Sequence, residues 1–207
     1  MIPGCSPNRE LVYCYFTRWK NNGVIEQVHE LLRDKIRQRA GKYESPSLAC
    51  IDSLSIKTTR LGTESRGFDG GKMIKGRKRH IVTDTMGLLL AVVVHATNMH
   101  DSKGATDVIA LLKGRFERLV KIVAAGGYRG VLIVKTKTTF GWILEIVLRS
   151  DHSSKFTVIP KKWVVERTFA WFESYRKLSK DFEYLTDTSE VMIQLAMIRL
   201  MLNKFKK

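Results

Sequence analysis

The chain of 207 residues carries 36 lysine and arginine residues against 20 aspartate and glutamate residues, for a formal net charge of +16. With 44% hydrophobic residues it can form the core of one domain, and no apolar run approaches the roughly 20 residues of a membrane-spanning helix. Cys5, Cys14 and Cys50 fit neither a disulfide framework nor a zinc site, and residues 1–10 lack the layout of a signal peptide, so a reducing cytoplasm is expected. A positive charge of this size points to a polyanionic partner, most often nucleic acid.

The first 47 residues are expected to form a helical segment ahead of the main domain, which we place at residues 48–207. An aromatic and apolar stretch at residues 11–19 is broken by Asn21-Asn22-Gly23, and residues 24–39 then have helical periodicity. The apolar face of this second segment is predicted from its spacing to contain Val24, Val28, Leu31, Leu32 and Ile36.

The main domain begins with strand-like segments. Residues 48–56 form a short apolar run that contains Asp52, and residues 79–84 and 88–96 are two further strands joined by a hairpin signal at Thr85-Met86-Gly87. Between these strands, residues 58–76 are polar and rich in glycine and are predicted to form a loop.

The second half of the chain alternates between helix and strand. Helices are predicted over residues 102–113, 161–177 and 189–205, and strands over residues 118–124 and 144–148. Residues 131–138 fit a helix and a strand equally well. A hairpin followed by parallel crossovers predicts an α/β fold, a mixed sheet with helices on both faces.

Asp52 is a candidate functional residue because it interrupts an apolar strand. An unpaired carboxylate is costly to bury, so Asp52 needs a metal ion, a basic partner or a strand end near solvent. Asp52 either does chemistry or accepts backbone hydrogen bonds at a strand edge, and the sequence leaves both interpretations open.

Glu166 is the second candidate. It lies in the first turn of the helix predicted over residues 161–177, where the helix dipole favours a carboxylate in any case. Helical spacing groups Glu166 with three other residues on one face: Ala170, Glu173 and Lys177. The neighbouring stripe is apolar: Val165, Phe169 and Phe172. Glu166 is therefore expected at the border between the core and a cleft.

Basic residues are concentrated in two places. Residues 72–80 contain five of them: Lys72, Lys75, Arg77, Lys78 and Arg79. The helix that carries Glu166 adds three more: Arg167, Arg176 and Lys177. Such clusters are either solvated faces or surfaces that contact phosphates, and the glycine-rich approach to the first one favours phosphate contact, which positions a duplex without reading its sequence. The five histidines have no metal-binding spacing, so a histidine metal site is not expected.

Five segments carry a family resemblance, in this order: residues 67–84 (GFDGGKMIKGRKRHIVTD), 88–101 (LLLAVVVHATNMHD), 124–130 (AAGGYRG), 144–150 (LEIVLRS) and 163–183 (WVVERTFAWFESYRKLSKDFE). Together they resemble bacterial insertion-sequence transposases of the DDE type, of the insertion-sequence-five-like branch. The resemblance covers about residues 11–206 and implies a ribonuclease-H-like core. It also implies that an additional N-terminal helical segment is shortened here, as in a truncated or decayed copy.

The resemblance implies which residues form the active site. The first catalytic acid of the family lies on the first strand, here Asp52, and the third lies on a late helix in V-E-R-T-F, here Glu166. The second acid follows the fourth strand in a pattern like A-D-x-G-Y-x-G, and Ala125 stands at that position. Asp84, Asp101 and Asp107 do not follow that strand, so we do not expect any of them to replace the missing acid.

Metal binding is expected to suffer from this replacement. The family's cores hold two divalent ions, Mg²⁺ or Mn²⁺, which activate water and then a 3′ hydroxyl for attack on DNA phosphodiesters. Asp52 and Glu166 would be the metal ligands that remain. Because alanine supplies no oxygen ligands and Mg²⁺ demands a nearly complete oxygen shell, weak metal binding is expected.

The resemblance implies a transposase that cuts and joins double-stranded DNA at element ends and target sites, as a homo-oligomer on the nucleoid and without a membrane partner. This copy would bind DNA but cleave it poorly. The alternative is a non-catalytic DNA-binding remnant that is inert or interferes with intact transposase. An RNA-binding module ranks last, because the strands offer no aromatic platform for single-stranded bases.

Overall fold

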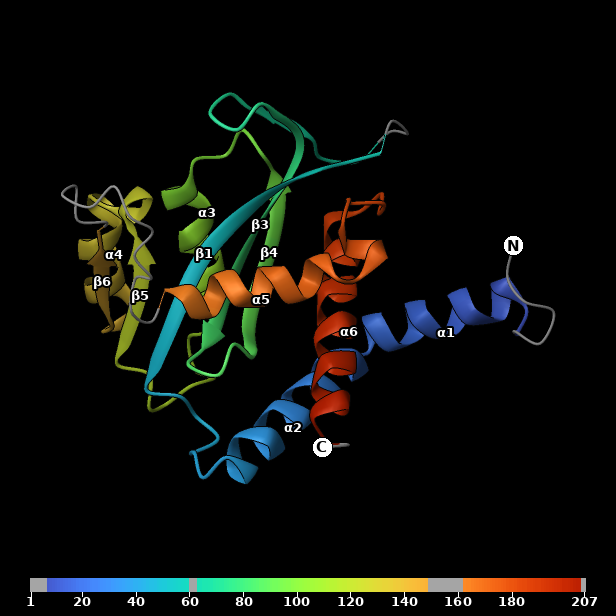
Figure 1. The fold of residues 1–207 in the computed structure, drawn as a ribbon, viewed down its shortest axis with the longest axis horizontal. Helices are drawn as coiled ribbons and strands as arrows, with labels where there is room; N and C mark the ends of the chain where they lie inside the picture. The colour runs from blue at the N-terminus through green and yellow to red at the C-terminus, as the bar shows by residue number, and fades with distance from the viewer. Residues whose placement is uncertain (1–6, 60–62, 149–161, 206–207) are drawn as a thin grey trace.

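The computed structural model describes residues 7–59, 63–148 and 162–205 (Figure 1). A mixed sheet lies at its centre, in the order β2-β3-β1-β5-β6, with β4 also paired to β3. The strands are β1 (Leu48–Lys57), β2 (Gly67–Asp69), β3 (Ile74–Asp84), β4 (Leu89–Ala96), β5 (Lys121–Ala125) and β6 (Ile143–Val147). The predicted mixed sheet is thereby confirmed.

The sheet has an antiparallel half and a parallel half. β3 runs antiparallel to both β1 and β4, and the turn between β3 and β4 contains Gly87 at φ 81°, a backbone conformation that glycine adopts without strain. β5 and β6 run parallel to β1. The expected hairpin at Thr85-Met86-Gly87 and the parallel crossovers are both present.

Helices cover both faces of the sheet. One core cluster joins the sheet to α3 (Asp101–Ala110) and α4 (Val131–Phe140), and a second joins it to α2 (Val24–Arg39), α5 (Trp163–Glu173) and α6 (Thr186–Phe205). α1 (Arg9–Asn21) points away from this body and has no buried residue (Figure 1). Among the described residues, no helix is long and apolar enough to cross a membrane.

Alternation along β1 assigns its side chains to the two faces. Ala49 and Ile51 pack in the cluster with α3 and α4, whereas Cys50 packs in the cluster with α5 and α6. Because strand side chains alternate, Asp52 faces α5 and Ser53 faces α3. β1 therefore presents Asp52 to the helix that carries Glu166.

Two local predictions need correction, and a third segment that was left open is resolved. The segment predicted to be a loop over residues 58–76 contains β2 and the start of β3. The segment over residues 131–138, which fitted helix and strand equally, is the helix α4. The helix expected to run to Lys177 ends at Glu173, and residues Arg176–Leu178 form a separate 3-10 turn.

The predicted apolar face of α2 is confirmed only in part. Ile36 is buried and Leu32 packs against the second core cluster as expected, whereas Val28 and Leu31 are exposed. The helix buries four further residues: Ile25, His29, Arg33 and Arg37. Apolar periodicity failed here because α2 buries charged side chains that find partners. The guanidinium of Arg33 lies 4.9 Å from the centre of the Phe116 ring, and Arg37 pairs with the buried Asp84.

Candidate functional site

Asp52 lies in the middle of β1 with one fifth of its side chain exposed. One carboxylate oxygen accepts a hydrogen bond of 2.9 Å from the backbone N–H of Ser53. Burial raises the pKa of Asp52, against the opposing effects of that hydrogen bond and of the nearby ammonium of Lys162. The charge of Lys72 also lowers the pKa of Asp52, which places this lysine near the same site.

Glu166 projects from the first turn of α5, half exposed, on the side of the helix that the sequence predicted. The apolar stripe beside it is buried as expected: Val165, Phe169 and Phe172. The Nζ atom of Lys162 lies 2.9 Å from Oε1 of Glu166 and 3.9 Å from Oδ2 of Asp52. One ammonium thus stands between the two candidate acids and brings them into a single site.

Ala125 is the last residue of β5. The parallel register of β5 with β1 runs from Leu48 opposite Lys121 to Cys50 opposite Val123, two residues short of Ala125. Ala125 pairs with Val147 of β6 and packs against the core cluster that contains α3 and α4. The family resemblance assigns its second acid to position 125, where the methyl group of alanine supplies no ligand oxygen.

Other aspartates are engaged elsewhere. Asp84 is fully buried, pairs with Arg37 and accepts hydrogen bonds from the backbone of Met86 and Leu88 in the hairpin turn. Asp101 lies on the opposite face of β1, where it accepts from Ser53 Oγ at 3.1 Å and pairs with Lys78 at 2.8 Å. Asp107 is exposed on α3. In the part of the chain that the structure describes, no three metal-ligating side chains form a cluster.

The expected basic surface at residues 72–80 needs correction, because three of its five members are buried: Arg77, Lys78 and Arg79. Arg77 donates to the backbone carbonyls of Ser65 and Glu183 and pairs with Asp181 at 3.3 Å. The other two are held by carbonyls, Lys78 by Met99 and Arg79 by Leu178. These three side chains bind partners within the protein, so in the folded chain they are not available to contact a phosphate.

The remaining predicted cations are accessible to different degrees. Exposed to solvent are Lys72, Lys75, Arg176 and Lys177. Arg167 is partly buried and donates to the carbonyl of Met86 at 3.0 Å. Its guanidinium lies between the rings of Trp163 and Trp171, at 4.3 and 4.7 Å from their centres. These two tryptophans therefore hold Arg167 in place, which supports packing as their role in this chain.

The pairing of Lys162 with both acids was missed in the sequence. Its signal was present, because Lys162 precedes Glu166 by four residues, the spacing at which helical side chains meet.

The sequence analysis also missed a buried pair of histidine rings, in which His80 Nδ1 lies 2.8 Å from His95 Nε2. Burial lowers the pKa of His80 to about 3, so the pair is neutral at physiological pH. Nothing in the sequence pattern indicated this contact, because His80 and His95 lie on different strands and the alternation of residues along each strand does not show which side chains meet across them.

Comparison with known proteins identifies the family. The model of the transposase DDE domain matches residues 43–201, most of the chain. The chain belongs to the transposase DDE domain family. In the core of this DDE domain, β1, β3 and β4 pair antiparallel, β5 and β6 run parallel to β1, and helices cover both faces of the sheet.

Individual proteins are similar to this DDE domain to different extents. It is 31% identical over 130 residues to a Burkholderia cepacia protein assigned as the transposase of insertion sequence element IS402. That match covers 58% of this chain and 60% of the relative, so the chain spans less than two thirds of its curated relative.

Two solved structures are similar to this chain at low sequence identity. The catalytic core domain of BIV integrase has 14% identity and a TM-score of 0.42, over 74% of this chain and 82% of that one. The catalytic domain of the Mos1 mariner transposase has 9% identity and a TM-score of 0.41, over 86% and 89%.

DDE transposases use divalent metal ions, and the side chains of this site do not fit a pair of them. Among the described residues, the carboxylates paired with Lys162 are those of Asp52 and Glu166, and Ala125, at the family's second acid position, has no side-chain oxygen. The Lys162 ammonium lies within ion-pair distance of both acids and neutralises part of their charge. Two carboxylates that already share an ion pair with Lys162 supply far fewer oxygen ligands than the nearly complete oxygen shell that Mg²⁺ requires.

Proposed function

We propose that this chain is an insertion-sequence transposase that binds double-stranded DNA at element ends and target, assembles there as a homo-oligomer, and is impaired in strand cleavage and transfer. The observation that carries the proposal is the family match over residues 43–201, and the alanine at position 125, where the family's second acid would stand, supports the impairment. The bacterial nucleoid would be its location.

Within this proposal Asp52 and Glu166 are the first and third acids of the family and the positions of its metal ligands. Mg²⁺ or Mn²⁺ would bind here weakly, because Ala125 lacks the ligand oxygens and Lys162 competes for both carboxylates. Restoring the acid addresses the first deficit but leaves the lysine in place.

DNA binding would use the accessible cations rather than the whole basic cluster. Lys72 lies near Asp52, Arg167 lies beside Glu166 in sequence on α5, and three further exposed residues are candidates: Lys75, Arg176 and Lys177. If about five to eight phosphates are neutralised, the logarithm of affinity should fall against the logarithm of salt with a slope of roughly −5 to −7.

The experiment compares strand cleavage and joining by the unaltered chain and by Ala125→Asp on the element's own ends, with Mg²⁺ and with Mn²⁺. Cleavage only by Ala125→Asp, abolished again when Asp52→Asn is added, is the expected result. Robust cleavage by the unaltered chain would refute the impairment. Absence of cleavage in both, with retained affinity for duplex DNA, would favour the second function below.

A second candidate function is a non-catalytic DNA-binding protein that is inert or interferes with intact transposase through mixed assembly. The ion pairs of Lys162 favour it, because they neutralise part of the site without any metal. It predicts that Asp52→Ala leaves DNA affinity unchanged and that added chain slows cleavage by an intact relative in a dose-dependent way. Preference for duplex DNA over single-stranded RNA separates both functions from RNA binding.

A further inference from the structure

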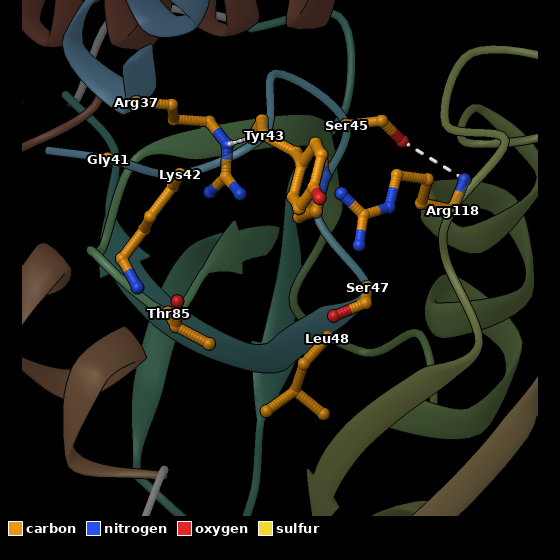
Figure 2. A pocket seen from close by; sticks show the side chains of 10 residues that line it. Arg37, Gly41, Lys42, Tyr43, Ser45, Ser47, Leu48, Thr85 and Arg118 are labelled. Atoms are coloured by element: carbon orange, nitrogen blue, oxygen red, sulfur yellow. Dashed lines mark hydrogen bonds between the residues drawn. The ribbon is translucent and has the colours of Figure 1, made fainter. Parts of the chain in front are cut away.

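A small hollow of about 200 Å³ opens at the start of β1, between the loop after α2 and the hairpin turn of β3 and β4 (Figure 2). Three cationic side chains line it: Arg37, Lys42 and Arg118. Three hydroxyl side chains line it as well: Ser45, Ser47 and Thr85. We call it the basic pocket.

The cations of the basic pocket are held in different ways. Arg37 is buried, pairs with Asp84 and donates from Nε to the carbonyl of Tyr43 at 2.7 Å, so its charge is already compensated. The guanidinium of Arg118 lies 3.4 Å from the centre of the Tyr43 ring, which fixes it against the rim. Lys42 and Arg118 reach toward the hollow from opposite sides (Figure 2).

In the described part of the chain, the charges of Lys42 and Arg118 have no carboxylate partner. No carboxylate lines the basic pocket, and among residues 7–59, 63–148 and 162–205 neither Lys42 nor Arg118 has an acidic partner within 4.0 Å. Ser45 Oγ accepts a hydrogen bond from the backbone N–H of Arg118 and keeps its own proton free to donate. Two free cations and several hydroxyl donors around one hollow are the groups that recognise a phosphate.

The position of the basic pocket relates it to Asp52. Leu48, which lines the pocket, and Asp52 are four residues apart on β1, so their side chains share a face of the sheet at a distance of about 13 Å. The basic pocket and Asp52 therefore lie along one strand on the same face of the sheet.

We propose that the basic pocket binds one backbone phosphate of duplex DNA through Lys42 and Arg118, about 13 Å along β1 from Asp52. This rests on the proposed function, namely that the chain binds duplex DNA. The hairpin turn links the two places structurally, because Thr85 lines the pocket and the carbonyl of Met86 accepts from Arg167 of α5.

The test is the salt dependence of affinity for a labelled duplex, measured by fluorescence anisotropy between 50 and 200 mM salt. Lys42→Gln with Arg118→Gln should reduce the size of the logarithmic slope by about 0.9, the value for one lost phosphate, and weaken affinity about eightfold near 0.1 M salt. The matched control, Lys135→Gln with Lys137→Gln, removes the same charge from exposed positions of α4 on the opposite face of the sheet. It should leave the slope within error of the unaltered chain.

A slope unchanged in the pocket variant, or changed equally in the control, would overturn the proposal while leaving duplex binding intact. Failure of the unaltered chain to bind duplex at all would instead overturn the proposed function. Arg118→Lys, which keeps the charge and loses the planar stack on Tyr43, should retain the slope.

Inorganic phosphate supplies the second arm. At matched ionic strength, phosphate in place of chloride should raise the melting temperature of the unaltered chain and not that of the pocket variant. Stabilisation by phosphate combined with an unchanged DNA slope would mean that the pocket holds a free phosphate, which contradicts the proposal. Equal melting temperatures in chloride check that the variants fold.

Discussion

Replacing Arg77 by methionine tests whether the centre of the basic cluster serves the fold or the DNA. The Arg77 side chain is fully buried, and its guanidinium donates to the carbonyls of Ser65 and Glu183 and pairs with Asp181, itself buried. Removing one member of a buried pair typically costs 3–5 kcal/mol, and the carbonyls left without donors act in the same direction. We therefore expect Arg77→Met to lower the free energy of unfolding by about 4 kcal/mol, a large part of the 5–15 kcal/mol typical of a domain.

Urea denaturation measures this loss directly. With a slope of about 2 kcal/mol per molar urea, a loss of about 4 kcal/mol moves the midpoint by about 2 M. Lys75→Met is the control on the same strand, because Lys75 is exposed and should change stability by less than about 0.5 kcal/mol. An Arg77→Met variant with unaltered stability and a weaker salt dependence of DNA binding would refute the structural role and restore the phosphate-contact interpretation.

Two further predictions concern carboxylates whose pKa the fold raises. Burial disfavours the charged form of Asp52, so Asp52→Asn should increase the free energy of unfolding at pH 7. This increase should shrink as the pH falls toward the pKa of about 3.9 that aspartate has in the unfolded chain. A lower free energy of unfolding at pH 7 would contradict the prediction. Burial raises the pKa of Glu190 to about 7, so the native state binds its proton more tightly and Glu190 should lower stability as the pH rises from about 4.5 to 7. Because His29 and His80, with pKa values lowered to about 3, act in the opposite direction, the measurement is the difference between the unaltered chain and Glu190→Gln, which should grow over that interval.

Local turn signals were the most informative part of the sequence for the fold. The break at Asn21-Asn22-Gly23 separates α1 from α2, and Gly23 has φ 68° there, which favours glycine. The apolar run around Asp52 predicted β1, and the hairpin signal after residue 84 predicted β4 and the second half of β3, in each case within one residue of the observed ends. These features depend on neighbours in the chain, which is why sequence reasoning could reach them.

Burial of charged residues was the part that the sequence could not give. In α2, counting apolar residues selected Val28 and Leu31, but the tertiary partner Asp84 draws Arg37 inward and rotates the buried face. In β3, a run of cations that reads as a surface is buried because Asp181 and several carbonyls more than 90 residues away complete it. No local pattern announces a partner that distant.

Part of the candidate site could be predicted from the residues themselves, and part only from the family resemblance. The odd carboxylate in an apolar strand singled out Asp52, and helical spacing correctly predicted that Glu166 borders an apolar stripe. Only the family resemblance marked Ala125 as a site position, because no sequence pattern distinguishes an alanine at the end of a strand.

The same geometry limits what a single substitution at Ala125 can achieve. As the site stands, two carboxylates share one ammonium, since Nζ of Lys162 lies 2.9 Å from Glu166 and 3.9 Å from Asp52. In the family's arrangement, which brings its second acid next to the first, an aspartate at position 125 would add a negative charge beside Asp52. Burial already raises the pKa of Asp52, and a like charge at close range raises it further. Without a divalent ion that charge is destabilising, and with one it is a ligand. Ala125→Asp should therefore lower stability in chelator and recover it on addition of Mn²⁺, whereas the unaltered chain should melt at the same temperature in both; equal melting behaviour of the two chains would show that position 125 does not face the site.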